Sequence, residues 1–166
     1  MPFIIRPTRP DDLPALLSLY AGARAYMVQQ NNPRQWAASG WPPEAVLRED
    51  IRLGRGYVCT VEERVCGAFV FLTGQEPEPG YAVIAQGAWR APGPYGVLHR
   101  LASDRSVPGI GAACLSWAWQ QFPHLRADTH PDNIPMQRLL EKCGFVRCGI
   151  VHVEQDSDPR YAYEKL

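Results

Sequence analysis

Apolar positions recur along the chain with two spacings, one typical of helices and one typical of strands. Leu13, Leu16 and Tyr20 follow the helical spacing after an acidic pair and beside Pro14, which suits the first turn of a helix. The polar run at 29–33 ends this helix. The same spacing predicts three more helices, two of which stop at a glycine. These cover residues 44–53, 109–122 and 134–143.

Short runs rich in β-branched and aromatic residues predict strands between these helices. Glu63 and Arg64 form the predicted hairpin turn between the second and third strands. Residues 74–94 hold many glycines and prolines and predict an irregular loop, with a short strand at 81–84 as an option. The order of elements indicates a mixed α/β domain over residues 1–166. The predicted strands cover residues 3–5, 57–62, 65–72, 95–102, 125–129, 145–153 and 161–165.

The composition narrows the class of protein. A chain of 166 residues, 46% hydrophobic and 20% charged, fits one folded domain with a substantial core. Seventeen basic and seventeen acidic residues balance to zero net charge, which gives no support to a nucleic-acid or membrane-surface partner. The chain has no run of about 18 apolar residues, and its first residues lack the features of a signal peptide.

The five cysteines predict neither disulfides nor a metal site. Their number is odd, and no C-x-x-C or Cys/His ligand spacing is present. We interpret them as reduced thiols of a cytoplasmic protein, mostly small buried apolar groups. No catalytic Cys/His arrangement is evident either, so we expect no cysteine nucleophile.

A glycine-containing loop between a predicted strand and a predicted helix is the first candidate for chemistry. Residues 106–113 read Ser-Val-Pro-Gly-Ile-Gly-Ala-Ala. Gly109 and Gly111 allow a tight turn, and the helix that follows presents free N–H groups and its positive dipole end to an anion. The loop could hold a pyrophosphate, although two glycines before a helix are more often an ordinary connection. Neither a P-loop nor a dinucleotide fingerprint is present.

A second feature follows the strand predicted at 125–129. A polar turn leads to Asn133, which can cap the next helix. That helix ends in Glu-Lys-Cys-Gly-Phe at 141–145. With the loop at 106–113 and the order of elements, these residues resemble the GNAT superfamily of N-acetyltransferases. The resemblance covers nearly the whole chain and implies a single mixed, mostly antiparallel sheet of about seven strands flanked by about four helices.

The chain departs from the pattern of this superfamily at three positions. Ser106 stands where the family has Gln or Arg, and Pro108 has no N–H to offer a phosphate. Leu140 stands where a Tyr often protonates the leaving thiolate.

The resemblance implies acetyl-CoA as co-substrate, no metal, and direct transfer of the acetyl group to a primary amine of a small molecule or peptide. The pyrophosphate would meet backbone amides of the glycine loop, and the pantetheine would pair with the edge of the strand at 95–102, where a backbone N–H polarises the thioester. Asn133 would reach the pantetheine arm. The residues expected at the cofactor are Leu101, Ala102, Val107, Gly109, Ile110, Gly111, Ala112, Asn133 and Arg138.

Two histidines are candidates for the general base. His99 lies on a predicted strand and His130 at the end of another, and imidazole titrates near neutral pH. Either could instead be structural, with water relaying the proton. Gln35, Trp36 and Trp41 lie where this superfamily builds its acceptor pocket, but aromatic residues equally close a core.

Two rival functions stay open. The chain could be a catalytically impaired CoA-binding sensor or interaction domain, a reading that Leu140 and Ser106 favour. It could also be an α/β binding domain unrelated to CoA. Turnover with a panel of amines, and thermal stabilisation by CoA, distinguish the three. A homodimer is compatible with the sequence, which does not identify the acceptor amine.

Overall fold

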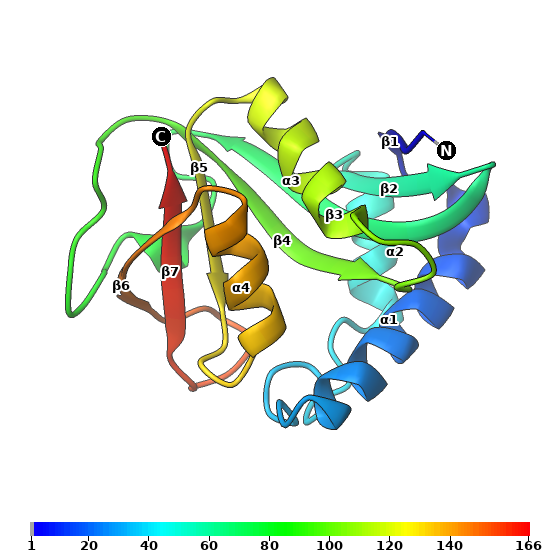
Figure 1. Ribbon diagram of the computed structural model, residues 1–166, viewed down its shortest axis with the longest axis horizontal. Helices are drawn as coiled ribbons and strands as arrows, with labels where there is room; N and C mark the ends of the chain where they lie inside the picture. Colours follow the sequence, from blue (N-terminus) through cyan, green and yellow to red (C-terminus); the bar gives the residue numbers. More distant parts are fainter. Residues whose placement is uncertain (1) are drawn as a thin grey trace.

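A computed structural model describes residues 2–166 of the chain (Figure 1). One seven-stranded sheet runs through the molecule in the order β1-β2-β3-β4-β5-β7-β6. All neighbouring strands are antiparallel except β4 and β5, which are parallel. The strands are β1 (Ile4–Pro7), β2 (Gly56–Val61), β3 (Arg64–Gly74), β4 (Tyr95–Ser103), β5 (Leu125–Thr129), β6 (Val146–Val151) and β7 (Arg160–Lys165).

Four α-helices cover the two faces of this sheet, as the sequence predicted. They are α1 (Leu13–Gln29), α2 (Glu44–Arg52), α3 (Ile110–Gln121) and α4 (Ile134–Lys142). Alternation along the strands divides the core between the faces. Val58 packs with the residues of α1 and α2, whereas the adjacent Cys59 packs with those of α3 and α4. Both side chains are fully buried. Figure 1 shows α3 and α4 together in front of the sheet.

The start of α1 illustrates how local chemistry defines an element. A short 3₁₀ turn, Pro10–Asp12, precedes the helix, and the Asp12 carboxylate accepts a hydrogen bond from the Arg9 amide at 2.7 Å. Arg6 on β1 makes two further hydrogen bonds to the same carboxylate. This holds the pKa of Asp12 below its usual value, chiefly through the Arg6 hydrogen bonds. Asp12 therefore anchors the helix start to the first strand.

Two predictions about connections were wrong. The β2–β3 hairpin turns at Glu62 and Glu63, both with positive φ, and Arg64 is already paired in β3. Residues 81–84 form no strand. A 3₁₀ turn, Pro79–Tyr81, occupies the start of that segment because the Glu78 carboxylate accepts from the Gly80 amide. An isolated bridge between Ala85 and Ile150 joins the loop to β6, as does a hydrogen bond from the Ala88 amide to the Cys148 carbonyl at 3.1 Å.

The 75–94 loop nevertheless packs tightly. Tyr81 is buried with Tyr95 and Val97 on the face of the sheet opposite α3. Its backbone carbonyl accepts a hydrogen bond from the indole of Trp89 at 2.9 Å. The loop thus closes one side of the sheet beside the carboxyl-terminal strands and places Glu78 near β4.

Within residues 2–166, none of the helices is long and apolar enough to cross a membrane.

Candidate active site

Strands β4 and β5 separate part of the way along their length, and this separation opens the site. The two strands pair only at Gly96 with Leu125 and at Val97 with Arg126. Farther along β4 the register with β3 shifts, and Arg100 has a positive φ of 54°. Such a bulge bends a strand away from its neighbour. The β5 side of β4 beyond Val97 therefore has backbone groups that no strand pairs.

A mostly apolar groove of about 300 Å³ occupies the opening on the side of α3 and α4. Leu101, Ala102 and Ser103 of β4 form its floor. Met27 of α1 and Leu139 of α4 contribute to its walls. An extended chain with amide groups, such as a pantetheine arm, could pair with the free edge of β4 there.

The glycine-containing loop lies at one end of this groove. Gly109 is the N-cap of α3 and adopts φ 89°, a conformation that glycine takes without a steric penalty. A Cβ on Gly111 would lie 2.7 Å from a methyl of Leu139, so that methyl would have to shift to admit a side chain between α3 and α4. The first amides of a helix have no intrahelical acceptor, so those of α3 can bind an anion.

Basic side chains that the sequence analysis did not identify flank the same end. Arg105 stacks on the ring of Tyr26 at 3.7 Å and lines the groove, as does Lys142 of α4. In the sequence, only the nearness of Arg105 to Gly109 and of Lys142 to Gly144 could have indicated that these side chains lie at the groove. Ser106, which replaces the basic or amide residue of the family pattern, accepts a hydrogen bond from Arg64 at 2.6 Å. Arg64 also pairs with Asp104, so it braces the loop.

The residues expected at the cofactor have different positions in the structure. Leu101, Ala102, Gly109 and Asn133 line the groove, as do Gly111 and Ala112. The side chain of Ile110 is buried in the core, and Val107 packs against that core, so only their backbone amides could serve a ligand. Arg138 is exposed on α4 and is not among the groove-lining residues.

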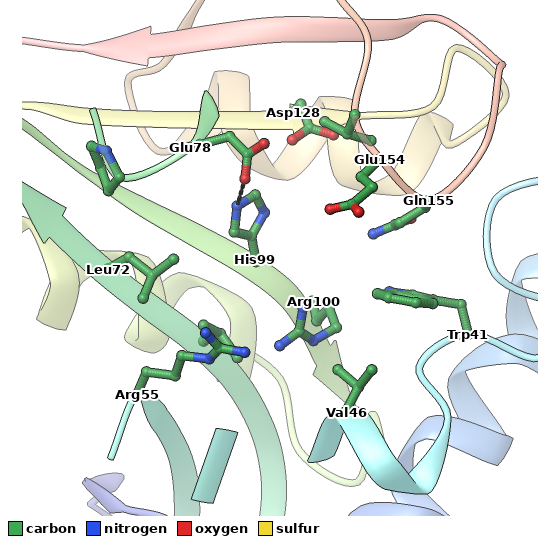
Figure 2. A pocket seen from close by; sticks show the side chains of 13 residues that line it. Trp41, Val46, Arg55, Leu72, Glu78, His99, Arg100, Asp128, Glu154 and Gln155 are labelled. Atoms are coloured by element: carbon green, nitrogen blue, oxygen red, sulfur yellow. Dashed lines mark hydrogen bonds and ion pairs between the residues drawn. The ribbon is translucent and has the colours of Figure 1, made fainter. Parts of the chain in front are cut away.

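A second, larger cavity of about 540 Å³ lies on the opposite side of the sheet opening (Figure 2). Polar or charged side chains make up about half of its walls, and apolar side chains, Trp41 among them, make up the rest. A small cavity of about 50 Å³ lies between it and the groove. That small cavity shares His99 with the large cavity and Leu101 with the groove. The three spaces therefore form a series through the sheet opening.

Only one of the three residues expected at the acceptor lines the large cavity. Trp41 lines it, whereas Gln35 and Trp36 are buried beside the small cavity. Gln35 accepts hydrogen bonds from Asn32 at 3.0 Å and from Asn133 at 2.9 Å. Asn133 also caps α4 by accepting from the Met136 amide, as the sequence predicted. Gln35 therefore links the α1–α2 connection to α4.

His99 lies where the large cavity meets the small one. Its Nε2 is 2.8 Å from a carboxylate oxygen of Glu78, and no other hydrogen bond to its ring occurs within residues 2–166. Burial opposes the charge of Glu78, but the hydrogen bond and charge of His99 hold the pKa of that carboxyl below its usual value. In Figure 2 the second ring nitrogen of His99 faces the cavity. Nδ1 is therefore the ring atom available to accept a proton.

His130 has a structural environment instead. Its Nδ1 accepts from the Asp132 amide at 3.0 Å, which leaves Nε2 to donate to Asp158 at 2.9 Å. The side chain is buried and lines none of the three spaces. Both ring nitrogens are thus engaged in holding the turn after β5 to the β6–β7 connection.

Asp128 and Leu140 are two further residues beside these cavities. Asp128 lines the large cavity, where burial raises the pKa of its carboxyl, and it accepts a 2.6 Å hydrogen bond from Tyr81. Leu140 is buried beside the small cavity, so it offers no acid at that position. Within residues 2–166, no group of three His, Cys, Asp or Glu side chains is arranged to hold a metal ion.

The comparisons with known proteins agree with this architecture. The family model described as an acetyltransferase (GNAT) domain matches residues 3–146. The chain therefore belongs to the GNAT acetyltransferase family, and family membership supports acyl transfer as its chemistry. No curated protein matches the chain.

Solved structures extend the likeness to the whole fold. A GNAT acetyltransferase from Streptococcus agalactiae is 28% identical, with a TM-score of 0.87 over 99% of this chain and 95% of that one. A GNAT acetyltransferase from Listeria monocytogenes is 19% identical, with a TM-score of 0.66 over 98% and 94%. A ribosomal-protein-alanine N-acetyltransferase from Brucella melitensis is 20% identical, with a TM-score of 0.64 over 98% and 99%. The last two show the fold alone.

Proposed function

We propose that this protein transfers an acetyl group from acetyl-CoA to a primary amine, without a covalent enzyme intermediate. The observation that carries the proposal is the series of spaces through the opening between β4 and β5. The groove has a free strand edge and helix amides suited to the pantetheine and pyrophosphate of acetyl-CoA. The large cavity has room for an acceptor, and His99 lies toward the groove side of it.

The protein's own groups fit the needs of such a transfer. Free amides of the first turn of α3, with Arg105 and Lys142 beside them, would hold the phosphates. The free edge of β4 near Leu101 and Ala102 would align the pantetheine and donate an N–H to the thioester oxygen. Such a hydrogen bond lowers the activation free energy by about 2.7–4 kcal/mol. Trp41 would form part of the acceptor wall, and Gln35 and Trp36 would shape the passage.

His99 is the general base in this proposal. Glu78 holds its Nε2–H, so Nδ1 takes a proton from the ammonium of the acceptor. The freed amine nitrogen then forms a bond to the thioester carbonyl carbon. The carbon–sulfur bond breaks, and the electron pair leaves on the CoA sulfur. The nitrogen loses its second proton as the amide forms, and, because Leu140 replaces the usual acid, water carries that proton to the thiolate. The engaged environment of His130 favours His99 for this role.

An impaired CoA-binding sensor is the second candidate, and the buried Leu140 favours it. Thiol release from acetyl-CoA with a panel of primary amines separates the two functions. We expect steady release that depends on both protein and amine. Binding of CoA without any amine-dependent release would support the sensor instead. A protein that neither binds nor is stabilised by CoA would contradict both.

A further inference from the structure

The walls of the large cavity carry opposite charges on opposite sides. In Figure 2, Arg55 and Arg100 lie along one side, and Glu78, Asp128 and Glu154 lie along the other. His99 lies between the two sides. This separation of charge bears on the identity of the acceptor, and any inference about the acceptor rests on the proposed N-acetyltransferase function.

The basic side of the cavity has two positive charges, on Arg55 and Arg100, and one carboxylate, Asp50, bonded to both. Asp50 is buried and accepts one hydrogen bond from Arg55, at 2.7 Å, and one from Arg100. Two guanidinium groups thus share one carboxylate. Neither guanidinium makes another hydrogen bond within residues 2–166, although each carries five N–H groups. The Arg100 side chain is 90% buried, and its Nε has no partner in that part of the chain.

Local structure holds both arginines in place. Arg100 lies at the bulge of β4, and its backbone carbonyl accepts a hydrogen bond from the Tyr20 hydroxyl at 2.7 Å. Arg55 directly precedes β2, and its carbonyl accepts from the Phe71 amide of β3. Their planar guanidinium groups are suited to a carboxylate, which they can bind through paired hydrogen bonds.

The opposite side suits a cation. Glu78 is held by His99, and Asp128 is held by Tyr81 and lies 3.9 Å from the Arg160 guanidinium. Glu154 has an exposed position at the edge of the cavity. An ammonium group on this side would meet carboxylates and would lie next to the imidazole that is proposed to take its proton.

We propose that the acceptor is an α-amino acid or a close analogue, a small molecule whose primary amine lies beside a carboxylate. The carboxylate contacts Arg55 and Arg100, which directs the amine toward His99. A polyamine would bring a second cation to the arginines. A peptide N-terminus has a neutral carbonyl where an amino acid has its carboxylate. The cavity therefore selects for the anionic group as well as for the amine.

The test compares matched acceptors at saturating acetyl-CoA, with thiol release as the readout. Each set contains a free amino acid, its carboxamide, its decarboxylated amine, and a dipeptide with the same N-terminal residue. We expect kcat/KM for at least one free amino acid to exceed that for its carboxamide by about 10- to 100-fold, the effect of losing one or two charge-assisted hydrogen bonds. The amine of the carboxamide is less basic than that of the free amino acid, so more of it is in the reactive, unprotonated form. This difference alone would favour the carboxamide, so it cannot produce the expected preference for the amino acid.

Variants of Arg55 link the preference to the cavity. Arg55→Gln should raise the KM of the amino acid by about tenfold and reduce its preference over the carboxamide, whereas Arg55→Lys should retain part of that preference. The KM of acetyl-CoA should stay unchanged in both. Arg52→Gln is the matched control, because Arg52 is exposed on α2, pairs with Glu49, and lines none of the three spaces. It should behave as the parent does.

The outcomes distinguish this inference from the function on which it rests. Efficient acetylation of carboxamides, decarboxylated amines or dipeptides, equal to or above that of the free amino acids, would overturn the inference and leave the N-acetyltransferase function intact. An amino-acid preference that Arg55→Gln leaves unchanged would also overturn it. Absence of turnover with every amine would count against the proposed function itself.

Discussion

The contact between Gly111 of α3 and Leu139 of α4 offers a direct test of where acetyl-CoA binds. A Cβ on Gly111 would lie 2.7 Å from a terminal methyl of Leu139, a side chain that lines the groove. In Gly111→Ala, that methyl must move by about 0.7 Å to reach ordinary van der Waals contact. The substitution therefore alters the groove wall without touching a charged or catalytic group.

Two opposing terms set the expected change in stability. Overpacking costs about 1–3 kcal/mol, and Ala is better than Gly within a helix by about 0.8–1.0 kcal/mol. The net loss in free energy of unfolding should be about 0–2 kcal/mol. Displacing one methyl from its contact with the ligand removes about 0.8 kcal/mol of apolar burial, so the Kd of acetyl-CoA should rise about fourfold.

Isothermal titration with acetyl-CoA and urea unfolding measure the two effects. Gly22→Ala is the control, because a Cβ on Gly22 of α1 meets nothing within 4 Å. It should leave the Kd unchanged. In the double variant Gly111→Ala with Leu139→Val, the shorter side chain relieves the contact, and a favourable coupling energy of about 0.5–3 kcal/mol is expected. A Kd of Gly111→Ala equal to that of the parent would refute the placement of the groove.

Four further outcomes are expected. Gly109→Asp should bind acetyl-CoA at least about tenfold more weakly than Gly109→Asn, which shares the backbone strain at φ 89°, because a carboxylate would repel the phosphates at the start of α3; equal affinity of the two folded variants would place the phosphates elsewhere. Asn133→Ala should lose about 0.5–2 kcal/mol of stability and also bind acetyl-CoA less tightly. Asn133→Ser should keep the helix cap and lose only affinity for acetyl-CoA. Urea unfolding measures the stability of both variants, and titration measures their affinity. The pKa of Glu78 in the folded state lies below its ordinary 4.5, so its pair with His99 stabilises the protein above that pH. The difference in Tm between the parent and Glu78→Gln should therefore shrink as the pH falls below 4.5. A Tm difference that does not depend on pH would contradict this. Mass spectrometry during turnover should find no acetyl group on any of the five cysteines.

Much of the fold could be predicted because the signals are local. The helical spacing of Leu13, Leu16 and Tyr20 and the glycine after Lys142–Cys143 depend on nearby residues alone. The supposed strand at 81–84 was wrong because Glu78 caps a 3₁₀ turn, which the apolar pattern of that segment does not reveal. The hairpin turn was displaced by one residue because Glu62 and Glu63 both adopt positive φ, which glycine usually signals.

The candidate site was less predictable because its groups come from distant segments. The sequence offered His99 as a candidate base and His130 as the alternative. Only the structure distinguishes them, since Asp158 lies 28 residues from His130 and Glu78 lies 21 residues from His99. The proposed role of Arg55 could not be identified from the sequence, because it depends on sharing Asp50 with Arg100 of β4. Such pairings arise from the sheet topology and leave no periodic signal in the sequence.

The single-turnover rate of His99→Gln tests the central claim most directly. Parent and variant are mixed with saturating acetyl-CoA and an acceptor that the parent uses, and formation of the N-acetyl product is followed in time. The proposed mechanism predicts a rate about 10²–10⁴-fold below that of the parent, the usual contribution of general acid–base catalysis, with the Kd of acetyl-CoA unchanged. A rate within about threefold of the parent would remove His99 from the mechanism, because a lost general base costs far more than that.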